Sequence, residues 1–323
     1  MKKLLFRVIL GVAVGVAVYV VFSVWADARS VGRALASFQW SLALAGVGLA
    51  FLNYLVRFGR WHYYLKVLGL SVPWGHSLLV FLSGFSLTVT PGKLGEMVKA
   101  LLLKESHGIP AARTAPIVVA ERFTDLVGLL LLACVGIFSF QVDKRFLILG
   151  AILILSGLVV ISVPPIANIF LRIFGKLPGI KKFSGKLNDA YATTAELLKP
   201  KALVLGVVLS TISWTFECLA FWVIVHGFAN ASIGLQAATF IYATMTVAGA
   251  LSFLPGGLGV TEAGMLGLLG QLGQGTGRSV AAAATFVTRL VTLWFAVALG
   301  LACLVIFARS THVRVDLPEK KST

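Results

Sequence analysis

Long apolar runs alternate with short polar segments along the whole chain. A helix needs about 20 apolar residues to cross the hydrocarbon core of a bilayer. The first run follows Lys2 and Lys3, but it exceeds the apolar part of a signal peptide, so we expect it to be retained as a span. The pattern predicts about six crossings, in the ranges 4–25, 42–58, 117–140, 146–163, 202–226 and 279–308.

The second of these runs ends in a patch that is both basic and aromatic. Aromatic side chains at the end of a span are typical of the membrane–water interface. We therefore expect this patch at the membrane surface: Arg57, Arg60, Trp61, Tyr63, Tyr64 and Lys66.

Two further apolar runs are broken by a Pro-Gly pair and then resume as helical patterns. Proline removes a backbone donor and fixes φ, while glycine permits turns that other residues resist. Two half-length helices joined in this way predict a re-entrant hairpin, which enters and leaves the membrane on the same side. The halves are 76–90 and 94–104 around Pro91-Gly92, and 235–254 and 258–272 around Pro255-Gly256-Gly257.

The two hairpins resemble each other at matched positions. Pro91 and Pro255 are 164 residues apart, Glu96 and Glu262 are 166 apart, and Arg122 and Arg289 are 167 apart. A nearly constant offset indicates an internal duplication, and chance similarity between glycine-rich apolar segments is the weaker explanation. The repeat halves are approximately 42–163 and 202–308.

Composition excludes an ordinary soluble protein. Hydrophobic residues make up 58% of the 323 residues, charged residues only 12%, and the mean hydropathy is +0.94. Soluble domains carry about 25% charged residues. The fold class is therefore an all-α polytopic membrane protein, with one integral membrane domain over 1–323. Its net charge of +16 fits cytoplasmic loops and anionic lipid better than nucleic acid, because no nucleic-acid-binding motif is present.

The cysteines and histidines indicate neither a disulfide framework nor a metal site. Cys134, Cys218 and Cys303 lie far apart within apolar runs, and the five histidines show no ligand spacing. We expect no metal and no cofactor.

Charge distribution predicts the topology. Six crossings and two hairpins place both termini on one side, and that side holds most of the Lys and Arg, including the basic segment 166–201. The positive-inside rule makes this side cytoplasmic, so the expected location is the cytoplasmic (inner) membrane. We expect 166–201 to be an amphipathic helical linker on the lipid surface. The first hairpin then enters from the cytoplasm and the second from outside, as in an inverted-topology repeat whose tips meet near the midplane.

Charged residues inside apolar segments are the candidate functional groups, because each costs about 2.5–3.5 kcal/mol at a helix centre. Glu96 and Glu262 follow the two breaks, where a helix N-terminus favours negative charge even without a function. Lys93 lies at the first tip, where a cation beside free backbone donors suits a phosphate, although a lysine reaching back to water is an equal alternative.

The remaining charges lie within long runs. Arg122 and Asp125 share one helix face with Glu121, and Arg122 is expected to pair with Glu96. Arg289 has no acid within its own turn, so Glu262 or Glu217 is its expected partner. Structural ion pairing is the alternative for each. The full candidate set for substrate binding and translocation is Pro91, Gly92, Lys93, Glu96, Arg122, Asp125, Glu217, Pro255, Gly256, Gly257, Glu262 and Arg289. We expect Glu96, Arg122, Glu262 and Arg289 to form one polar cluster, with Glu217 lining the same cavity.

Three motifs together resemble a known family: residues 90–96 (TPGKLGE), 121–125 (ERFTD) and 255–262 (PGGLGVTE). They are similar to the transmembrane region of lysylphosphatidylglycerol synthases, the flippase-like half of multiple-peptide-resistance factors. The resemblance covers nearly the whole chain and implies lipid translocation by the membrane region. In full-length synthases a soluble C-terminal domain transfers the amino acid. Only a short basic tail follows the last run here, so we expect a stand-alone member without the transferase.

The expected function is movement of a lipid with an anionic or zwitterionic, phosphate-containing headgroup, of the phospholipid or polyprenyl-phosphate type. The alternative is an intramembrane enzyme, or an accessory subunit of a lipid-linked glycosyl- or aminoacyl-transferase. A scaffold without transport is a third hypothesis. No catalytic constellation is visible in the sequence, which favours a carrier over an enzyme. The expected partner is a membrane lipid, with a separate transferase or a second copy of the chain as further candidates.

Overall fold

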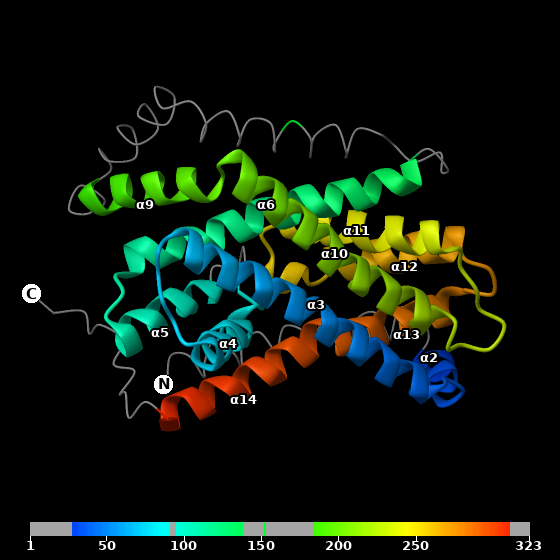
Figure 1. Ribbon diagram of the computed structural model, residues 1–323. Coiled ribbons are helices and arrows are strands. Elements are labelled where there is room, and N and C mark those ends of the chain that lie inside the picture. Colours follow the sequence, from blue (N-terminus) through cyan, green and yellow to red (C-terminus); the bar gives the residue numbers. More distant parts are fainter. Residues whose placement is uncertain (1–27, 91–94, 138–151, 153–183, 311–323) are drawn as a thin grey trace, which may run out of the picture.

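The computed structural model describes residues 28–90, 95–137, 152 and 184–310, and throughout this part of the chain the secondary structure is helical. An isolated β-bridge joins Ser232 to Gln274. The fold class predicted from the sequence is confirmed (Figure 1). The helices are α2 (Ala28–Ala36), α3 (Trp40–Val67), α4 (Trp74–Ser83), α5 (Val98–His107), α6 (Ala111–Ile137), α9 (Ser184–Leu197), α10 (Pro200–Val225), α11 (Leu235–Leu251), α12 (Val260–Leu272), α13 (Arg278–Arg289) and α14 (Phe295–Ser310).

Three helical segments in the described part are long and apolar enough to cross a membrane: α3, α10 and the continuous stretch Arg278–Ser310. That stretch joins α13 and α14 through a π-helical turn at Leu290–Trp294. α6 has the length of a span, with 27 residues, but carries charged residues in its first half. The expected runs 4–25 and 146–163 lie outside the described residues apart from Ile152, so the count of six spans stays a prediction.

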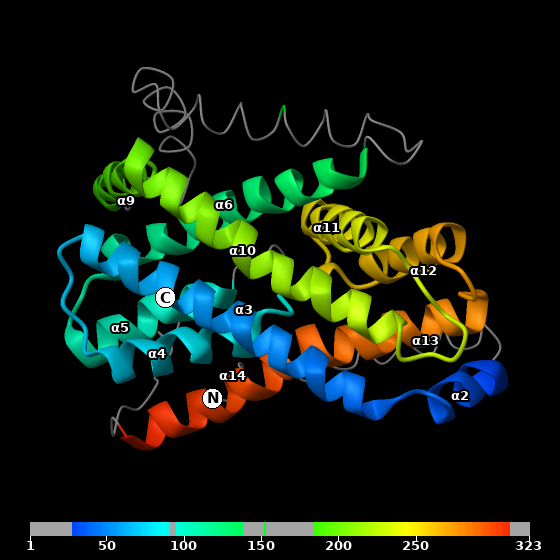
Figure 2. The ribbon, with the colours of Figure 1, turned by 45° about the vertical axis from the view of Figure 1, so that its right-hand side comes forward.

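Both hairpins consist of two short helices separated by a break. α4 continues as a 3-10 turn over Gly84–Leu87, and the second half of that hairpin is α5. In the second hairpin a 3-10 turn at Pro255–Gly257 separates α11 from α12. Figures 1 and 2 place α4 and α5 at one end of the bundle and α11 and α12 at the other.

The tips of the hairpins meet inside the protein. A methyl group at Gly256 would lie 3.4 Å from Cγ1 of Val89, two residues before Pro91. The expected contact between the tips is therefore present on the described side of the first break. Pro91 and Gly92 lie outside the described residues.

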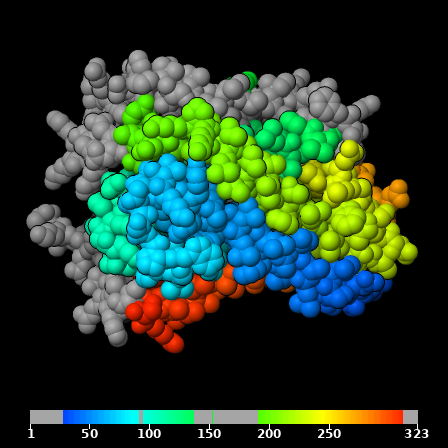
Figure 3. All heavy atoms as spheres, viewed as in Figure 1, coloured from blue at the N-terminus to red at the C-terminus, as the bar shows by residue number. Residues whose placement is uncertain are grey.

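Each hairpin is packed in its own hydrophobic cluster. One cluster gathers Phe81, Leu103 and Ile117 around α4, α5 and the start of α6. The other gathers residues of α11, α12 and α13, such as Ala238 and Leu269. α3 and α10 lie side by side across one face and bridge the two clusters (Figure 3). Their outer faces expose large apolar side chains, as expected for contact with lipid: Leu44, Phe51, Leu55, Val204, Val208 and Ile212.

The prediction that the basic aromatic patch lies at the membrane surface is wrong for most of its residues. α3 continues to Val67, and Arg57, Arg60, Trp61 and Tyr64 are all buried. Their spacing of three, four and seven residues places them on one helix face, and that face packs against the protein interior. The arginines find carboxylate partners there instead of lipid headgroups.

Candidate functional site

The first break presents Glu96 to three cations. Gly95 donates its backbone N–H to Oγ1 of Thr90 at 2.7 Å, which folds the chain back before α5. A side chain at position 95 would meet the carbonyl oxygen of Leu87 at 2.5 Å, so the turn needs glycine for space. The Glu96 side chain is 1% exposed, and its Oε2 lies 3.1 Å from Nη2 of Arg122. Arg57 and Lys99 approach the same oxygen at 3.8 and 3.9 Å.

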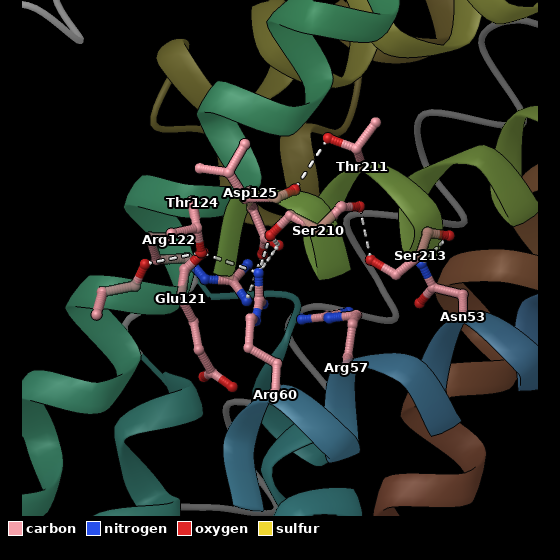
Figure 4. A network of polar contacts seen from close by, with 12 residues as sticks. Asn53, Arg57, Arg60, Glu121, Arg122, Thr124, Asp125, Ser210, Thr211 and Ser213 are labelled. Carbon is pink, nitrogen blue, oxygen red and sulfur yellow. Dashed lines mark hydrogen bonds and ion pairs between the residues drawn. The ribbon is translucent and has the colours of Figure 1, made fainter. Parts of the chain in front are cut away.

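Asp125 links Arg122 to the interior of the bundle (Figure 4). Oδ1 of Asp125 accepts hydrogen bonds from Nη1 of Arg60 at 2.8 Å and from the hydroxyl of Ser210 at 3.1 Å. Arg60 also donates to Oγ1 of Thr124 at 3.0 Å and to Ser210. Oδ2 of Asp125 forms an ion pair with Nη2 of Arg122 at 3.1 Å, without hydrogen-bond alignment. One carboxylate therefore holds α3, α6 and α10 together.

Glu121 on α6 joins the network through Lys99, which also approaches Glu96. Nζ of Lys99 lies 2.6 Å from Oε2 of Glu121, and both side chains are 1% exposed. The Lys99 ammonium also lies over the rings of Trp61 and Phe81, at 4.6 and 5.2 Å from their centroids. Gly84 makes room for this lysine, because a methyl group there would lie 2.7 Å from Cγ of Lys99.

The second break holds its acid and its arginine within one compact unit. Oε2 of Glu262 accepts the backbone N–H of Gly259 at 2.7 Å, which caps the N-terminus of α12. Oε1 of Glu262 lies 2.6 Å from Nε of Arg289. Nη2 of Arg289 donates to the carbonyl oxygen of Gly256, also at 2.6 Å. Gly256 has a φ of 63°, a left-handed conformation that favours glycine.

Both arginines line one cavity of about 230 Å³. Asp125 and Trp214 contribute from α6 and α10, and most of the remaining wall comes from the second hairpin. Thr246 and Thr261 supply hydroxyl groups. Gly249 and Gly257 have no side chains, so their backbone forms part of the wall. The wall ends at Phe253 and Leu254, which are 72% and 44% exposed, so the cavity reaches the apolar surface of the protein.

The structure brings together only part of the predicted site. The expected ion pair Arg122–Glu96 is confirmed, and of the two expected partners of Arg289, Glu262 and Glu217, the structure pairs it with Glu262. Arg122 and Arg289 reach one cavity with Asp125, Gly256 and Gly257. Glu96 and Glu262 form ion pairs with these two arginines from outside the cavity wall. Pro255 begins the turn of the second tip. The predicted residues Pro91, Gly92 and Lys93 lie outside the described residues.

Glu217 does not line this cavity. It is buried on α10, and its Oε2 accepts a hydrogen bond of 2.5 Å from the hydroxyl of Tyr242 on α11. The expectation that its position in mid-span places it in the cavity is not met, because a tyrosine on the neighbouring helix satisfies it instead.

Three cations of the network were not among the predicted site residues: Arg57, Arg60 and Lys99. A signal for the two arginines exists in the sequence. Arg57 and Arg60 share their helix face with Trp61 and Tyr64, and they continue the buried positions Ala50 and Tyr54. Lys99 lies three residues after Glu96, which is the spacing of neighbours on a helix surface.

No group of three or more His, Cys, Asp or Glu side chains is placed to hold a metal ion within residues 28–90, 95–137, 152 and 184–310. Carboxylates in this part of the chain engage arginine, lysine, serine, tyrosine or backbone donors instead.

Residues 8–300 match the family described as lysylphosphatidylglycerol synthase TM region. The chain belongs to this family. The protein is therefore an integral membrane protein, and membership agrees with the apolar helices described above.

Relatives of similar length exist in archaea. A UPF0104 membrane protein of Methanothermobacter thermautotrophicus is 26% identical over 283 residues, covering 79% of this chain and 82% of the relative. A second from the same organism is 28% identical over 225 residues, covering 64% and 66%. A UPF0104 membrane protein of Methanocaldococcus jannaschii is 25% identical over 272 residues, covering 77% and 80%.

Proposed function

We propose that this protein translocates a lipid with a phosphate-containing headgroup across the cytoplasmic membrane. The observation that carries the proposal is the cavity beside the tip of the second hairpin, which Arg122 lines from α6 and Arg289 from the end of α13. Arginine binds phosphate through its planar fork of N–H donors. Two arginines from opposite halves of an inverted repeat can bind one headgroup from either side of the membrane in turn.

The mouth of the cavity fits a lipid better than a soluble anion. Phe253 and Leu254 lie at the mouth with large exposed apolar surfaces, and Leu251 continues the apolar wall inward. A headgroup between the arginines would leave its acyl chains beside these residues and in the surrounding bilayer. We accordingly propose a carrier that releases its lipid chemically unchanged, and not an enzyme.

The proposal includes an orientation with both termini in the cytoplasm. It can be tested at the two ends of α10, where Ala192 on α9 and Ala229 after α10 are both exposed. Single cysteines at these positions, with Cys134, Cys218 and Cys303 replaced by alanine, should react with an impermeant reagent from opposite sides of the membrane. Reaction of position 192 from outside would contradict the orientation.

Transport is tested in proteoliposomes with a fluorescent phospholipid that a reductant bleaches only in the outer leaflet. We expect bleaching beyond one half of the label at a rate above protein-free liposomes. Arg289→Lys and Arg122→Lys keep the buried charge but lose the planar fork, so the rate should fall about tenfold or more in each, which corresponds to about 1.4 kcal/mol.

The matched control is Arg113→Lys. Arg113 lies on α6, as Arg122 does, but it donates to the carbonyl oxygen of Leu68 and does not line the cavity. This variant should transport at the wild-type rate. A wild-type protein that moves no phospholipid faster than protein-free liposomes would overturn the proposal.

A further inference from the structure

The cavity carries charges of both signs, and their partners decide which sign a ligand meets. Among the described residues of its wall, Arg122 and Arg289 are the cations and Asp125 is the carboxylate. On composition alone this is a mixed site, suited equally to a headgroup with a phosphate and an amine. The hydrogen bonds that these residues make outside the cavity wall mean that a phosphate and an amine are not equally suited to the site.

Asp125 is already compensated on both of its oxygens. Oδ1 accepts from Arg60 and from Ser210, and Oδ2 faces Arg122 at 3.1 Å. Arg60 is 0% exposed, and moving it away would leave the carboxylate of Asp125 as an uncompensated charge in the interior, which is strongly destabilising. An amine that entered the cavity would have to compete with two guanidinium groups for one acid.

Arg122 keeps donors on the cavity side. Its contacts with Glu96 and Asp125 both run through Nη2, while a guanidinium group has five N–H donors. Its side chain lines the cavity and is 24% exposed. Arg289 adds a second guanidinium to the same wall. The binding capacity that remains is therefore for an anion.

We infer that the cavity selects a headgroup whose only charge is its phosphodiester, and that Arg60 sets this selectivity by keeping Asp125 from binding an amine. Arg60 is a positioning residue, because it acts on the ligand through Asp125 and lies outside the cavity wall. The inference rests on the proposed lipid substrate and narrows it to anionic phosphodiester lipids.

Binding is measured apart from transport, as the shift in melting temperature of the detergent-purified protein. The probes are dihexanoyl phosphatidylglycerol and dihexanoyl phosphatidylethanolamine, which differ in the amine. Glycerophosphoglycerol and inorganic phosphate serve as soluble anions. The glycerol lipid should bind more tightly than the ethanolamine lipid, and equal binding of the two would overturn the inference. Both soluble anions should bind more weakly than the glycerol lipid, because they make no contact with the apolar mouth of the cavity.

Arg60→Gln tests the selectivity directly. It leaves Asp125 with one fewer cation, so the ratio of ethanolamine-lipid to glycerol-lipid affinity should rise about tenfold, which is about 1.4 kcal/mol. The double variant Arg60→Gln with Asp125→Asn also removes the acid that has lost its cation, so it should return the ratio to the wild-type value. A purely structural role for Arg60 would weaken both lipids equally and leave the ratio unchanged, which would overturn its assignment.

A second variant covers the case in which Arg60→Gln does not fold. Asp125→Asn alone should preserve or strengthen the preference for the glycerol lipid, since both arginines remain on the wall. Tighter binding of the ethanolamine lipid to the wild-type protein, or binding of neither lipid, would overturn the inference. Selective binding without movement in proteoliposomes would contradict the proposed function and leave the inference standing.

Discussion

The two predicted repeat halves each hold an acid–arginine pair, and they hold it in different ways. In the first half, Glu96 faces Arg57, Lys99 and Arg122, and Arg122 also faces Asp125. The contacts reach α3, α5 and α6, and through Ser210 they extend to α10. In the second half, the Glu262–Arg289 pair is completed by backbone groups of Gly256 and Gly259.

The difference shows that one kind of ion pair can be supported in two ways within one fold. Glu262 is fixed by the tip and helix to which it belongs, so the second unit depends on one hairpin and on α13. The first unit distributes its charges over several helices, so Glu96 and Asp125 each have more than one cation nearby. The second unit should therefore be the more sensitive to loss of a single side chain.

The largest expected effect is that of Arg289→Ala. It leaves Glu262, 1% exposed, without its close cation, and breaking a buried ion pair costs about 3–5 kcal/mol. Arg122→Ala should cost less, about 1–3 kcal/mol, because Arg60 stays beside Asp125 and Arg57 and Lys99 stay near Glu96. Unfolding in mixed detergent–SDS micelles measures both. Arg278→Ala, exposed at the start of α13, is the control, and a larger loss in Arg122→Ala would reverse the comparison.

The Lys99–Glu121 pair tests whether the first network has a purely structural part. Lys99→Met should destabilise the protein by about 3 kcal/mol, because Glu121 is then buried without its cation. Lys99→Met combined with Glu121→Leu removes both charges, and apolar replacement of a buried pair is often neutral or stabilising. Neither residue lines the cavity, so the double variant should recover stability and retain transport. Loss of transport in a stable double variant would place this pair in the transport mechanism.

Neutral substitutions of the two acids give a smaller effect on stability and a direct test of their role. Glu262→Gln and Glu96→Gln each keep an acceptor but remove the charge behind a cavity arginine, so we expect both to abolish lipid movement. Glu262→Gln should lower stability by about 1–3 kcal/mol, and Glu96→Gln by less, since Arg122 retains Asp125. Glu105→Gln, exposed on α5, is the control. Transport at the wild-type rate in both variants would leave the carboxylates with a purely architectural role.

Sequence reasoning succeeds where a local pattern has one physical explanation. The Pro-Gly breaks predict half-helices because the backbone cannot continue a helix through them, and the two hairpins are present. The cost of a lone charge in hydrocarbon predicts that Arg122 pairs with Glu96 and that Arg289 pairs with Glu262 or Glu217, and the structure shows Glu96 and Glu262 as the partners.

It fails where two environments produce the same local pattern. The position of an arginine near the end of an apolar run does not distinguish lipid headgroups from a buried acid, so the predicted environment of Arg57 and Arg60 is wrong. The partner of Arg60 lies 65 residues away, and no local spacing reveals it. Glu217 is the reverse case: its cost in mid-span is real, but the hydroxyl of Tyr242 satisfies it outside the cavity. Tertiary neighbours decide each case.

The smallest expected effects come from the glycines of the two breaks, which are needed for different reasons. Gly95 needs space, since a side chain there would meet Leu87 and Thr90 within 2.7 Å, and overpacking costs about 1–3 kcal/mol. Gly256 needs conformation, since its φ is 63° while the nearest side-chain atom would be 3.4 Å from an added methyl group. Alanine in a left-handed conformation costs about 1–2 kcal/mol, and asparagine tolerates it better. Melting temperatures should therefore rank Gly256→Asn above Gly256→Ala, but Gly95→Asn below Gly95→Ala. The same order at both positions would show that one constraint governs both tips.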